Sequence, residues 1–400
     1  MTQSTASKVI KVTTGQFALE GAVLGRQILI AHLLGAETLG GFLLVMLAWR
    51  AALMVSEMAL DRFLLVQQGD SALATIQTLN LARMALVAMG LFIVCHTLKP
   101  IDGYIWIAAA CLIKGWQNLS YRVALRDGDP AAFQVIEVWP TIAFLPAYGI
   151  TGFLQGAAAD LAALLCLQSA IEVTLSHLKS NHRFLLGWDK KIIKAAITFA
   201  WPLWLSGLLM FGSLYLERLA FADRLDIAVF AGLAIALQLA QLPIQVLGRV
   251  ALVFGLPFIS KATSNPLDRL RFETMGVLAG LAICVGFILA APHVLPLVFD
   301  LQVGTDLILL IAIAQGLRCL RIAGSVTAQA RKKTHIPLIA NGVRIAGVLA
   351  AVPAFLTMGD PAILLSAGVV AEIAALIIQH LLLFQAPKRE KSYVYRPNTP

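Results

Sequence analysis

One uncharged run settles the class of structure to expect. Residues 274–298 read Thr274-Met-Gly-Val-Leu-Ala-Gly-Leu-Ala-Ile-Cys-Val-Gly-Phe-Ile-Leu-Ala-Ala-Pro-His-Val-Leu-Pro-Leu-Val298, without a single Asp, Glu, Lys or Arg. A helix rises 1.5 Å per residue, so a run of this length crosses the roughly 30 Å of hydrocarbon in a bilayer. The segment therefore predicts a transmembrane helix and not the core of a soluble domain.

Eleven further runs of similar length lie on either side of this one, and the composition of the whole chain agrees with them. The chain is 59% hydrophobic and 13% charged, whereas soluble domains carry about 25% charged residues. The sequence predicts an all-α, polytopic membrane protein with about 12 transmembrane helices. The expected spans are 10–33, 39–63, 72–96, 103–124, 131–153, 156–176, 194–217, 227–256, 274–298, 305–328, 335–357 and 362–384.

The longest polar connection lies between the sixth and seventh spans and divides the chain into two parts of six helices. We expect two six-helix bundles around a central cleft. The expected domains are an N-terminal bundle over 1–178, a cytoplasmic linker over 179–193, a C-terminal bundle over 194–385 and a cytoplasmic tail over 386–400.

The basic residues alternate between the two sets of loops. One set of loops and tails holds about twenty Lys and Arg residues, and the other holds only Lys99, Arg218 and Arg224. By the positive-inside rule this asymmetry places both termini in the cytoplasm. It also accounts for most of the net charge of +9, so we expect no nucleic-acid partner.

No residue pattern typical of catalysis or of a bound metal is visible. The five cysteines are widely spaced within apolar runs, which is typical of small core residues. No His pairs with a Cys or an acid at ligand spacing, and no glycine-rich phosphate loop is followed by lysine. We expect no catalytic residue, no metal, no cofactor and no enzymatic activity.

Polar residues recur at helical spacing within several spans. Gln238, Gln241, Gln245 and Arg249 fall on one face of the eighth span. Similar stripes are predicted in the first, second, fourth, fifth, tenth and eleventh spans. They contain Glu20, Arg50, Glu57, Lys114, Glu137, Arg318, Arg321 and Arg344. Because charges at membrane depth are costly, these faces predict a wet cavity between the two bundles.

Cations outnumber acids within the spans by eight to six, which favours an anionic ligand. The planar guanidinium of arginine is suited to phosphate oxygens. The candidate substrate-binding residues are Arg50, Arg249, Arg318 and Arg344, with Arg26, Arg321 and Lys114 in reserve. The acids Glu20, Glu57 and Glu137 are candidates for ion coupling, and Gln238, Gln241 and Gln245 for the polar lining of the cavity. Alternatively, each charge only binds a neighbouring helix, as Glu57 with Arg50 or Glu137 with Lys114 would.

In the first half, Ala31-His-Leu-Leu-Gly-Ala-Glu-Thr-Leu-Gly-Gly-Phe42, preceded by Arg26, resembles the Leu-Gly-x-Glu-x-x-Gly turn of the oligosaccharide flippases, a family of Wzx-type O-antigen translocases. In the second half, Ala200-Trp-Pro-Leu-Trp-Leu-Ser-Gly207 resembles their seventh helix, and Glu217-Arg218 stands where an Asp-Arg pair is usual. The turn before Ile227 echoes the turn of the first half as a weak internal repeat.

This resemblance implies the fold of the multidrug, oligosaccharidyl-lipid and polysaccharide exporter superfamily, in a bacterial inner membrane. It implies a flippase that moves a polyprenyl-diphosphate-linked oligosaccharide from the cytoplasmic to the periplasmic leaflet by alternating access. The partners it implies are the lipid-linked oligosaccharide, membrane lipid, and a polysaccharide polymerase or glycosyltransferases. Two alternatives stay open: a proton- or sodium-coupled drug or cation exporter, and a non-transporting assembly subunit of a polysaccharide synthesis complex.

Overall fold

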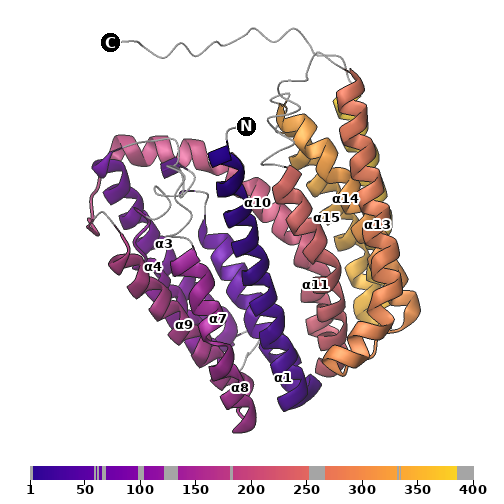
Figure 1. Cartoon of the computed structure of the whole chain (residues 1–400), viewed down its shortest axis with the longest axis horizontal. Coiled ribbons are helices and arrows are strands. Elements are labelled where there is room, and N and C mark those ends of the chain that lie inside the picture. Colours follow the sequence, from indigo (N-terminus) through magenta and orange to yellow (C-terminus); the bar gives the residue numbers. More distant parts are fainter. Residues whose placement is uncertain are drawn as a thin grey trace.

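The computed structural model describes residues 3–57, 60, 63–64, 69–97, 103–120, 134–180, 183–251, 266–330, 333 and 335–384. Every regular element within these ranges is helical, and the predicted tail over 386–400 lies outside them (Figure 1). The helices are α1 Gln3–Glu57, α3 Asp70–Thr97, α4 Tyr104–Gly115, the π-helix η1 Gln134–Val138, α7 Trp139–Ala143, α8 Leu145–Phe153, α9 Ala158–Leu178, α10 Lys190–Arg224, α11 Ile227–Val250, α13 Pro266–Phe299, α14 Thr305–Ala330, α15 His335–Met358 and α16 Pro361–Phe384.

The expected all-α, polytopic membrane fold is confirmed. Among the described residues, eight helices are long and apolar enough to cross a bilayer. One of them, Phe17–Ser56, is 40 residues long and makes two crossings because it bends in the middle. We call α1 to α9 the first half and α10 to α16 the second half.

The bend in α1 is at Gly35, between the first and second expected spans. Gly35 has φ 78° and ψ 177°, which an L side chain adopts only with strain. The glycine therefore lets the chain reverse there without a long loop. We call the end of the molecule with this bend the turn end, and the opposite end, where α1 begins, the terminal end.

The fourth expected span, 103–124, is wrong over residues 116–119, which are not helical. Helix α4 ends at Gly115. Gln117 and Asn118 therefore do not continue a helical stripe, and Asn118 instead accepts hydrogen bonds from Gln77 Nε2 at 3.0 Å and from the backbone N–H of Ser120 at 3.1 Å. Short polar side chains of this kind compete with the helix for backbone hydrogen bonds.

The fifth expected span, 131–153, is not one continuous helix. It consists of η1, α7 and α8 in succession, with Pro140 in the first turn of α7 and Pro146 in the first turn of α8. Proline has no N–H to donate to the preceding turn, so it starts a helix more readily than it continues one. The stretch from Gln134 to Phe153 is correspondingly segmented.

Helix α10, the first helix of the second half, also packs against the first half. It is 35 residues long, about 52 Å at 1.5 Å per residue, and begins within the predicted linker over 179–193. Its first part runs across the terminal end of the first half (Figure 1). There Ala196 and Ala200 are fully buried in a cluster with Leu60, Phe63 and Ile76 of the first half.

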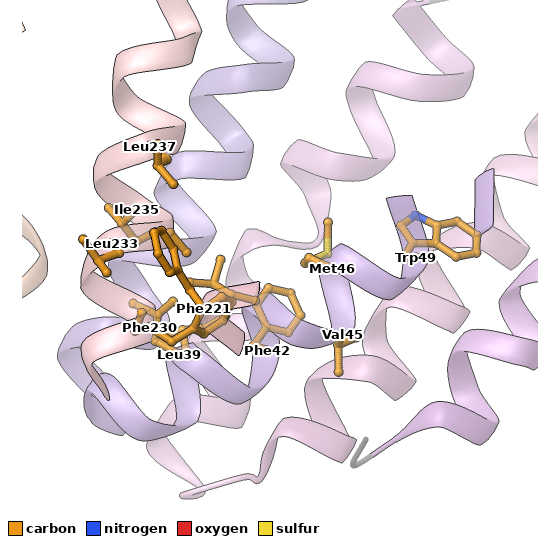
Figure 2. Close-up of a cluster of buried hydrophobic side chains, with 14 of the residues drawn as sticks. Leu39, Phe42, Val45, Met46, Trp49, Phe221, Phe230, Leu233, Ile235 and Leu237 are labelled. Atoms are coloured by element: carbon orange, nitrogen blue, oxygen red, sulfur yellow. The ribbon is translucent and has the colours of Figure 1, made fainter. Parts of the chain in front are cut away.

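The two halves meet mainly where α1 packs against α11 and α10. Near the turn end, Leu39 and Phe42 of α1 lie beside Phe221 of α10 and Phe230 of α11 in one buried cluster (Figure 2). Lipid tails are as apolar as these side chains, so close packing and not the hydrophobic effect holds such helices together.

Gly40 makes the closest approach at this contact. A Cβ atom at Gly40 would lie 2.4 Å from the backbone oxygen of Ile227, the first residue of α11. No side chain fits at that distance. The two turns that echo each other in the sequence therefore touch in space, and the halves are in contact at the turn end.

Candidate functional site

Two arginines from opposite halves flank one tyrosine where the halves face each other. Arg50 of α1 donates from Nη1 to the hydroxyl oxygen of Tyr215 on α10 at 2.8 Å. The guanidinium carbon of Arg218, also on α10, lies 4.9 Å from the centre of the Tyr215 ring, and that of Arg50 lies 5.9 Å from it. Both separations are within the range of cation–π attraction. We call Arg50, Tyr215 and Arg218 the interhalf site.

Amide side chains complete the interhalf site. A cavity of about 20 Å³ is lined by Arg50, Tyr215 and Arg218 together with Gln27 of α1 and Gln238 of α11, and it is large enough for roughly one water molecule. Gln27 donates from Nε2 to Gln238 Oε1 at 3.0 Å. Arg218 Nε, Gln27 Oε1 and Gln238 Nε2 are buried without a hydrogen-bond partner. The site thus offers two unused donors and one unused acceptor to a ligand.

The interhalf site holds two positive charges that have no direct ion pair. Among the residues that the structure describes, neither Arg50 nor Arg218 forms an ion pair with a carboxylate. Glu20 is near enough to attract Arg50 electrostatically, and Gln241 accepts a hydrogen bond from Arg218 Nη2 at 2.9 Å. Two guanidinium groups that line one cavity have the charge to attract a phosphate-bearing anion, and the cavity must widen by separation of the halves to admit one.

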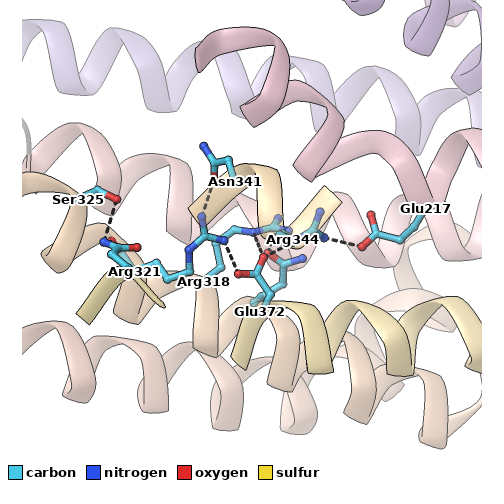
Figure 3. Close-up of polar contacts among 9 residues, drawn as sticks. Glu217, Arg318, Arg321, Ser325, Asn341, Arg344 and Glu372 are labelled. Carbon is cyan, nitrogen blue, oxygen red and sulfur yellow. Dashed lines mark hydrogen bonds and ion pairs between the residues drawn. The ribbon is translucent and has the colours of Figure 1, made fainter. Parts of the chain in front are cut away.

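A second cluster of charges lies wholly within the second half. Arg344 on α15 donates a hydrogen bond from Nη2 to Glu217 of α10 at 2.5 Å and forms an ion pair with Glu372 of α16, with Nε 2.5 Å from Oε1 (Figure 3). Glu372 also pairs with Arg318 Nε at 3.0 Å and Arg321 Nη1 at 2.6 Å, both on α14. We call these five residues the second-half network. It ties four helices together and has three positive groups for two negative ones.

The structure divides the predicted anion-binding arginines into two groups. Arg318 and Arg344 contact Glu372 in the second-half network, together with the reserve candidate Arg321, which also donates to Asn341. Arg50 is at the interhalf site. The side chain of Arg249 lies outside the described residues, although its backbone is in α11. The two carboxylates of the network pair with the charges of the three clustered arginines, although Arg321 Nε, Arg344 Nε and Arg344 Nη1 are buried without a hydrogen-bond partner.

Arg26, another reserve candidate, is enclosed by aromatic rings of the first half. Its guanidinium carbon lies 5.0 Å from the ring centres of both Phe42 and Tyr148, and Nη1 donates to the Tyr148 hydroxyl oxygen at 3.3 Å. The side chain is buried. These contacts hold α1 against α8 and leave Arg26 little freedom to meet a large ligand.

Lys114, the third reserve candidate, is in a pair within the first half. It forms an ion pair with Glu172 of α9, not the expected pair with Glu137. Gln168 donates from Nε2 to Glu172 Oε1 at 2.8 Å and to Thr141 Oγ1 at 3.0 Å. The Lys114 charge is therefore neutralised, and the group connects α4, α7 and α9.

The remaining candidates are distributed between the halves. Gln238 and Gln241 contact the interhalf site, as described above, and Gln245 is half-buried on the same helix. Glu137 is half-buried in η1, away from any continuous helical stripe. The side chain of Glu57 lies outside the described residues, so the expected pair with Arg50 does too.

Sequence reasoning missed four residues that the structure puts at the centre of these clusters. Arg218 was assigned to an outer loop because the seventh span was ended at 217, yet α10 continues to Arg224 and Arg218 is buried. Tyr215 was missed because it is uncharged and the candidates for anion binding were chosen by charge. Glu217 and Glu372 were isolated acids in apolar spans, and that isolation is itself a signal, because such an acid requires a buried partner.

The described residues contain no group of three His, Cys, Asp or Glu side chains that could hold a metal ion. The arrangement instead suits non-covalent binding, with cations, amides and an aromatic ring lining the contact between the two halves.

Neither a protein-family model nor a curated protein matches this sequence. Solved structures do. A multidrug resistance MATE family transporter of the MOP superfamily, in an inward-facing conformation, aligns with TM-score 0.68 at 15% identity over 90% of this chain and 94% of its own. The lipid II flippase MurJ, in an inward closed conformation, aligns with TM-score 0.67 at 13% identity over 94% of this chain and 88% of its own.

A third solved structure, a MOP superfamily transporter from Pyrococcus furiosus described as having a binding pocket of reverse polarity, aligns with TM-score 0.56 at 17% identity over 94% of each chain. The chain therefore has the fold of MOP superfamily transporters. The first and third of these proteins are described as transporters and the second as a flippase.

Proposed function

We propose that this protein is a flippase for a polyprenyl-diphosphate-linked oligosaccharide. The observation that carries the proposal is the interhalf site, where Arg50 and Arg218 face one cavity from opposite halves without a carboxylate partner among the described residues. A diphosphate can accept hydrogen bonds from both guanidinium groups at once. Binding it would therefore connect the two halves, as alternating access requires.

The glutamines next to the arginines support a sugar-bearing cargo. Gln27, Gln238 and Gln241 each carry a donor and an acceptor, which suits the mixed hydroxyl chemistry of a glycan. A hydrophobic drug would leave these buried amides poorly satisfied. The same residues stay close to the diphosphate site because they lie on α1 and α11, the two helices that line the contact between the halves.

In the proposed orientation the protein spans a bacterial inner membrane with both termini on the cytoplasmic side. In that orientation the turn end faces the periplasm, so the packing of Gly40 against Ile227 closes the periplasmic side. Substrate would then enter from the cytoplasmic side, and transport would require this contact to separate. The second-half network supports such a motion because it joins α10, α14, α15 and α16 into one unit.

The decisive experiment uses purified protein in proteoliposomes with a fluorescent polyprenyl-diphosphate disaccharide. Movement between leaflets is followed by quenching with an impermeant reagent. Arg50→Ala and Arg218→Ala should each lower the rate at least about tenfold, since a hydrogen bond to a charged group contributes about 1.5–3 kcal/mol and about 1.4 kcal/mol is a factor of ten. Arg224→Ala, at the exposed end of the same helix α10, is the matched control and should be normal. Normal rates for both cavity variants would refute the proposal.

A coupled drug or cation exporter is the second candidate, favoured by the likeness to a multidrug resistance transporter and by the acid Glu20, whose charge attracts Arg50. In this case Glu20→Gln should abolish export of a cationic dye driven by a proton or sodium gradient. Under the flippase proposal, wild-type protein should not move the dye at all.

A further inference from the structure

An apolar groove lies between α11 and α13, separate from the interhalf site. It has a volume of about 420 Å³ and is lined by Leu239, Pro243, Ile283, Gly286, Phe287 and Ala290, among other apolar residues. No lining residue carries a charge or a polar side chain. The groove therefore fits an apolar chain and offers nothing to a sugar or a phosphate.

The groove exists because α13 packs closely against α14 and presents small residues to α11. On the α14 side, a Cβ atom at Gly280 would lie 2.8 Å from the backbone oxygen of Gly316, so those two helices are in near contact. On the groove side, Ala282, Gly286 and Ala290 follow one another at steps of four residues, which places them in one row. A Cβ atom at Gly286 would have no neighbour within 4 Å.

This groove faces the hydrocarbon of the bilayer. In the most apolar 18-residue stretch of α13, only 11% is buried inside the protein. This is the smallest buried share among the candidate spans of the described residues. An occupant with polar groups could not satisfy them at this depth. In another protein an apolar cavity of about 150 Å³ holds benzene, so this groove has room for roughly 15 carbon atoms of a lipid chain.

Helix α11 contributes residues to both the groove and the interhalf site. Gln238 lines the interhalf cavity, and the next two residues, Leu239 and Ala240, line the groove. One helix thus presents an amide to the polar site and aliphatic carbons to the apolar one within three successive residues. We infer that the groove holds part of the polyprenyl tail of the transported lipid while its diphosphate is at Arg50 and Arg218; this inference rests on the proposed function.

The test fills the groove without disturbing the polar site. Gly286→Leu adds a side chain where the structure has open space, and Gly90→Leu on the lipid-facing side of α3 is its matched control, since a Cβ there also meets nothing within 4 Å. Both variants are compared in proteoliposomes with a full-length polyprenyl-diphosphate disaccharide and with an analogue of only two isoprene units. Gly286→Leu should slow the long substrate at least about fivefold and leave the short one unchanged, whereas Gly90→Leu should slow neither.

Photolabelling decides the inference independently of transport. A polyprenyl phosphate with a diazirine in its tail should label the α13 peptide of the wild-type protein, and Gly286→Leu should lose that label. Excess polyprenyl phosphate should compete and excess phospholipid should not. Equal competition by phospholipid would make the occupant an ordinary bilayer lipid and overturn the inference. An equal slowing of both substrates would overturn it too, while loss of transport in Arg50→Ala would still uphold the proposed function.

Discussion

Glu217 and Arg218 are neighbours in the sequence but contact different clusters. Glu217 accepts a hydrogen bond from Arg344 within the second half, and Arg218 lines the interhalf cavity with Arg50. Successive helical residues point about 100° apart, so one turn of α10 can serve both clusters. A displacement of this turn would therefore change both the second-half network and the contact between the halves.

Removal of Arg344 should strongly destabilise the second half. Glu217 would lose the arginine to which it is bonded at 2.5 Å, while Glu372 would keep Arg318 and Arg321. Breaking a buried ion pair typically costs about 3–5 kcal/mol. We expect Arg344→Met to lower the unfolding temperature of the purified protein in detergent by several degrees.

The double variant Arg344→Met, Glu217→Gln is the control for this prediction. It removes the carboxylate that Arg344→Met leaves unpaired, and it should recover a large part of the loss. If the double variant were as unstable as the sum of the two single variants, Arg344 and Glu217 would not be energetically coupled.

Replacement of Lys114 should have a smaller effect than replacement of Arg344. The Lys114–Glu172 pair is partly exposed, at 13% and 10% of the two side chains, and Glu172 keeps its hydrogen bond from Gln168. We expect Lys114→Met to lower the unfolding temperature by less than half the shift of Arg344→Met, with normal flipping of the lipid-linked disaccharide. Loss of flipping in a stable Lys114→Met protein would bring this residue into the substrate path.

Gly40→Ala should prevent the halves from closing at the turn end. The new Cβ would meet the Ile227 backbone oxygen at 2.4 Å, a distance that only a shift of a helix can relieve. Transport should fall at least about tenfold at an unchanged membrane level. Gly149→Ala is the control, because a Cβ at Gly149 meets nothing within 4 Å.

A labelling experiment can show directly whether the contact at the turn end opens. In a background without the five native cysteines, Phe42→Cys should react slowly with an impermeant maleimide, because Phe42 is fully buried between the halves. Adding Gly40→Ala should speed the reaction. Equal rates with and without Gly40→Ala would contradict the predicted opening.

The proposed topology can be checked with a reporter enzyme that is active only in the periplasm. A fusion after Tyr395 should be silent, because the basic loops place that end in the cytoplasm. A fusion after Asp360, in the short turn between α15 and α16, should be active. An active reporter after Tyr395 would mean that the number of spans is odd or the orientation reversed.

Hydropathy alone predicted the fold class because bilayer thickness fixes how long an apolar helix must be. It could not predict that Asn118 lies beyond the end of α4, or that Pro140 and Pro146 segment the fifth span, because these effects depend on local hydrogen bonds. The boundary error at the seventh span had the largest consequence, since it removed Arg218 from the expected membrane interior.

The candidate site was predictable only in part. Helical periodicity correctly assigned Gln238 and Gln241 to one face, and the structure brings both to the interhalf site. Periodicity does not say which helices are neighbours, however. Arg318 and Arg344 could be assigned to polar faces from the sequence, but their shared partner Glu372 is on a span that has no polar stripe of its own.

The position of α10 also has a consequence for biosynthesis. Ala196 and Ala200 complete a cluster whose other members precede residue 120 in the sequence. During translation, this cluster cannot be completed until the beginning of α10 has left the ribosome. The chain reaches its sixth crossing with that cluster still open, and the next helix to emerge closes it before the remainder of the second half exists.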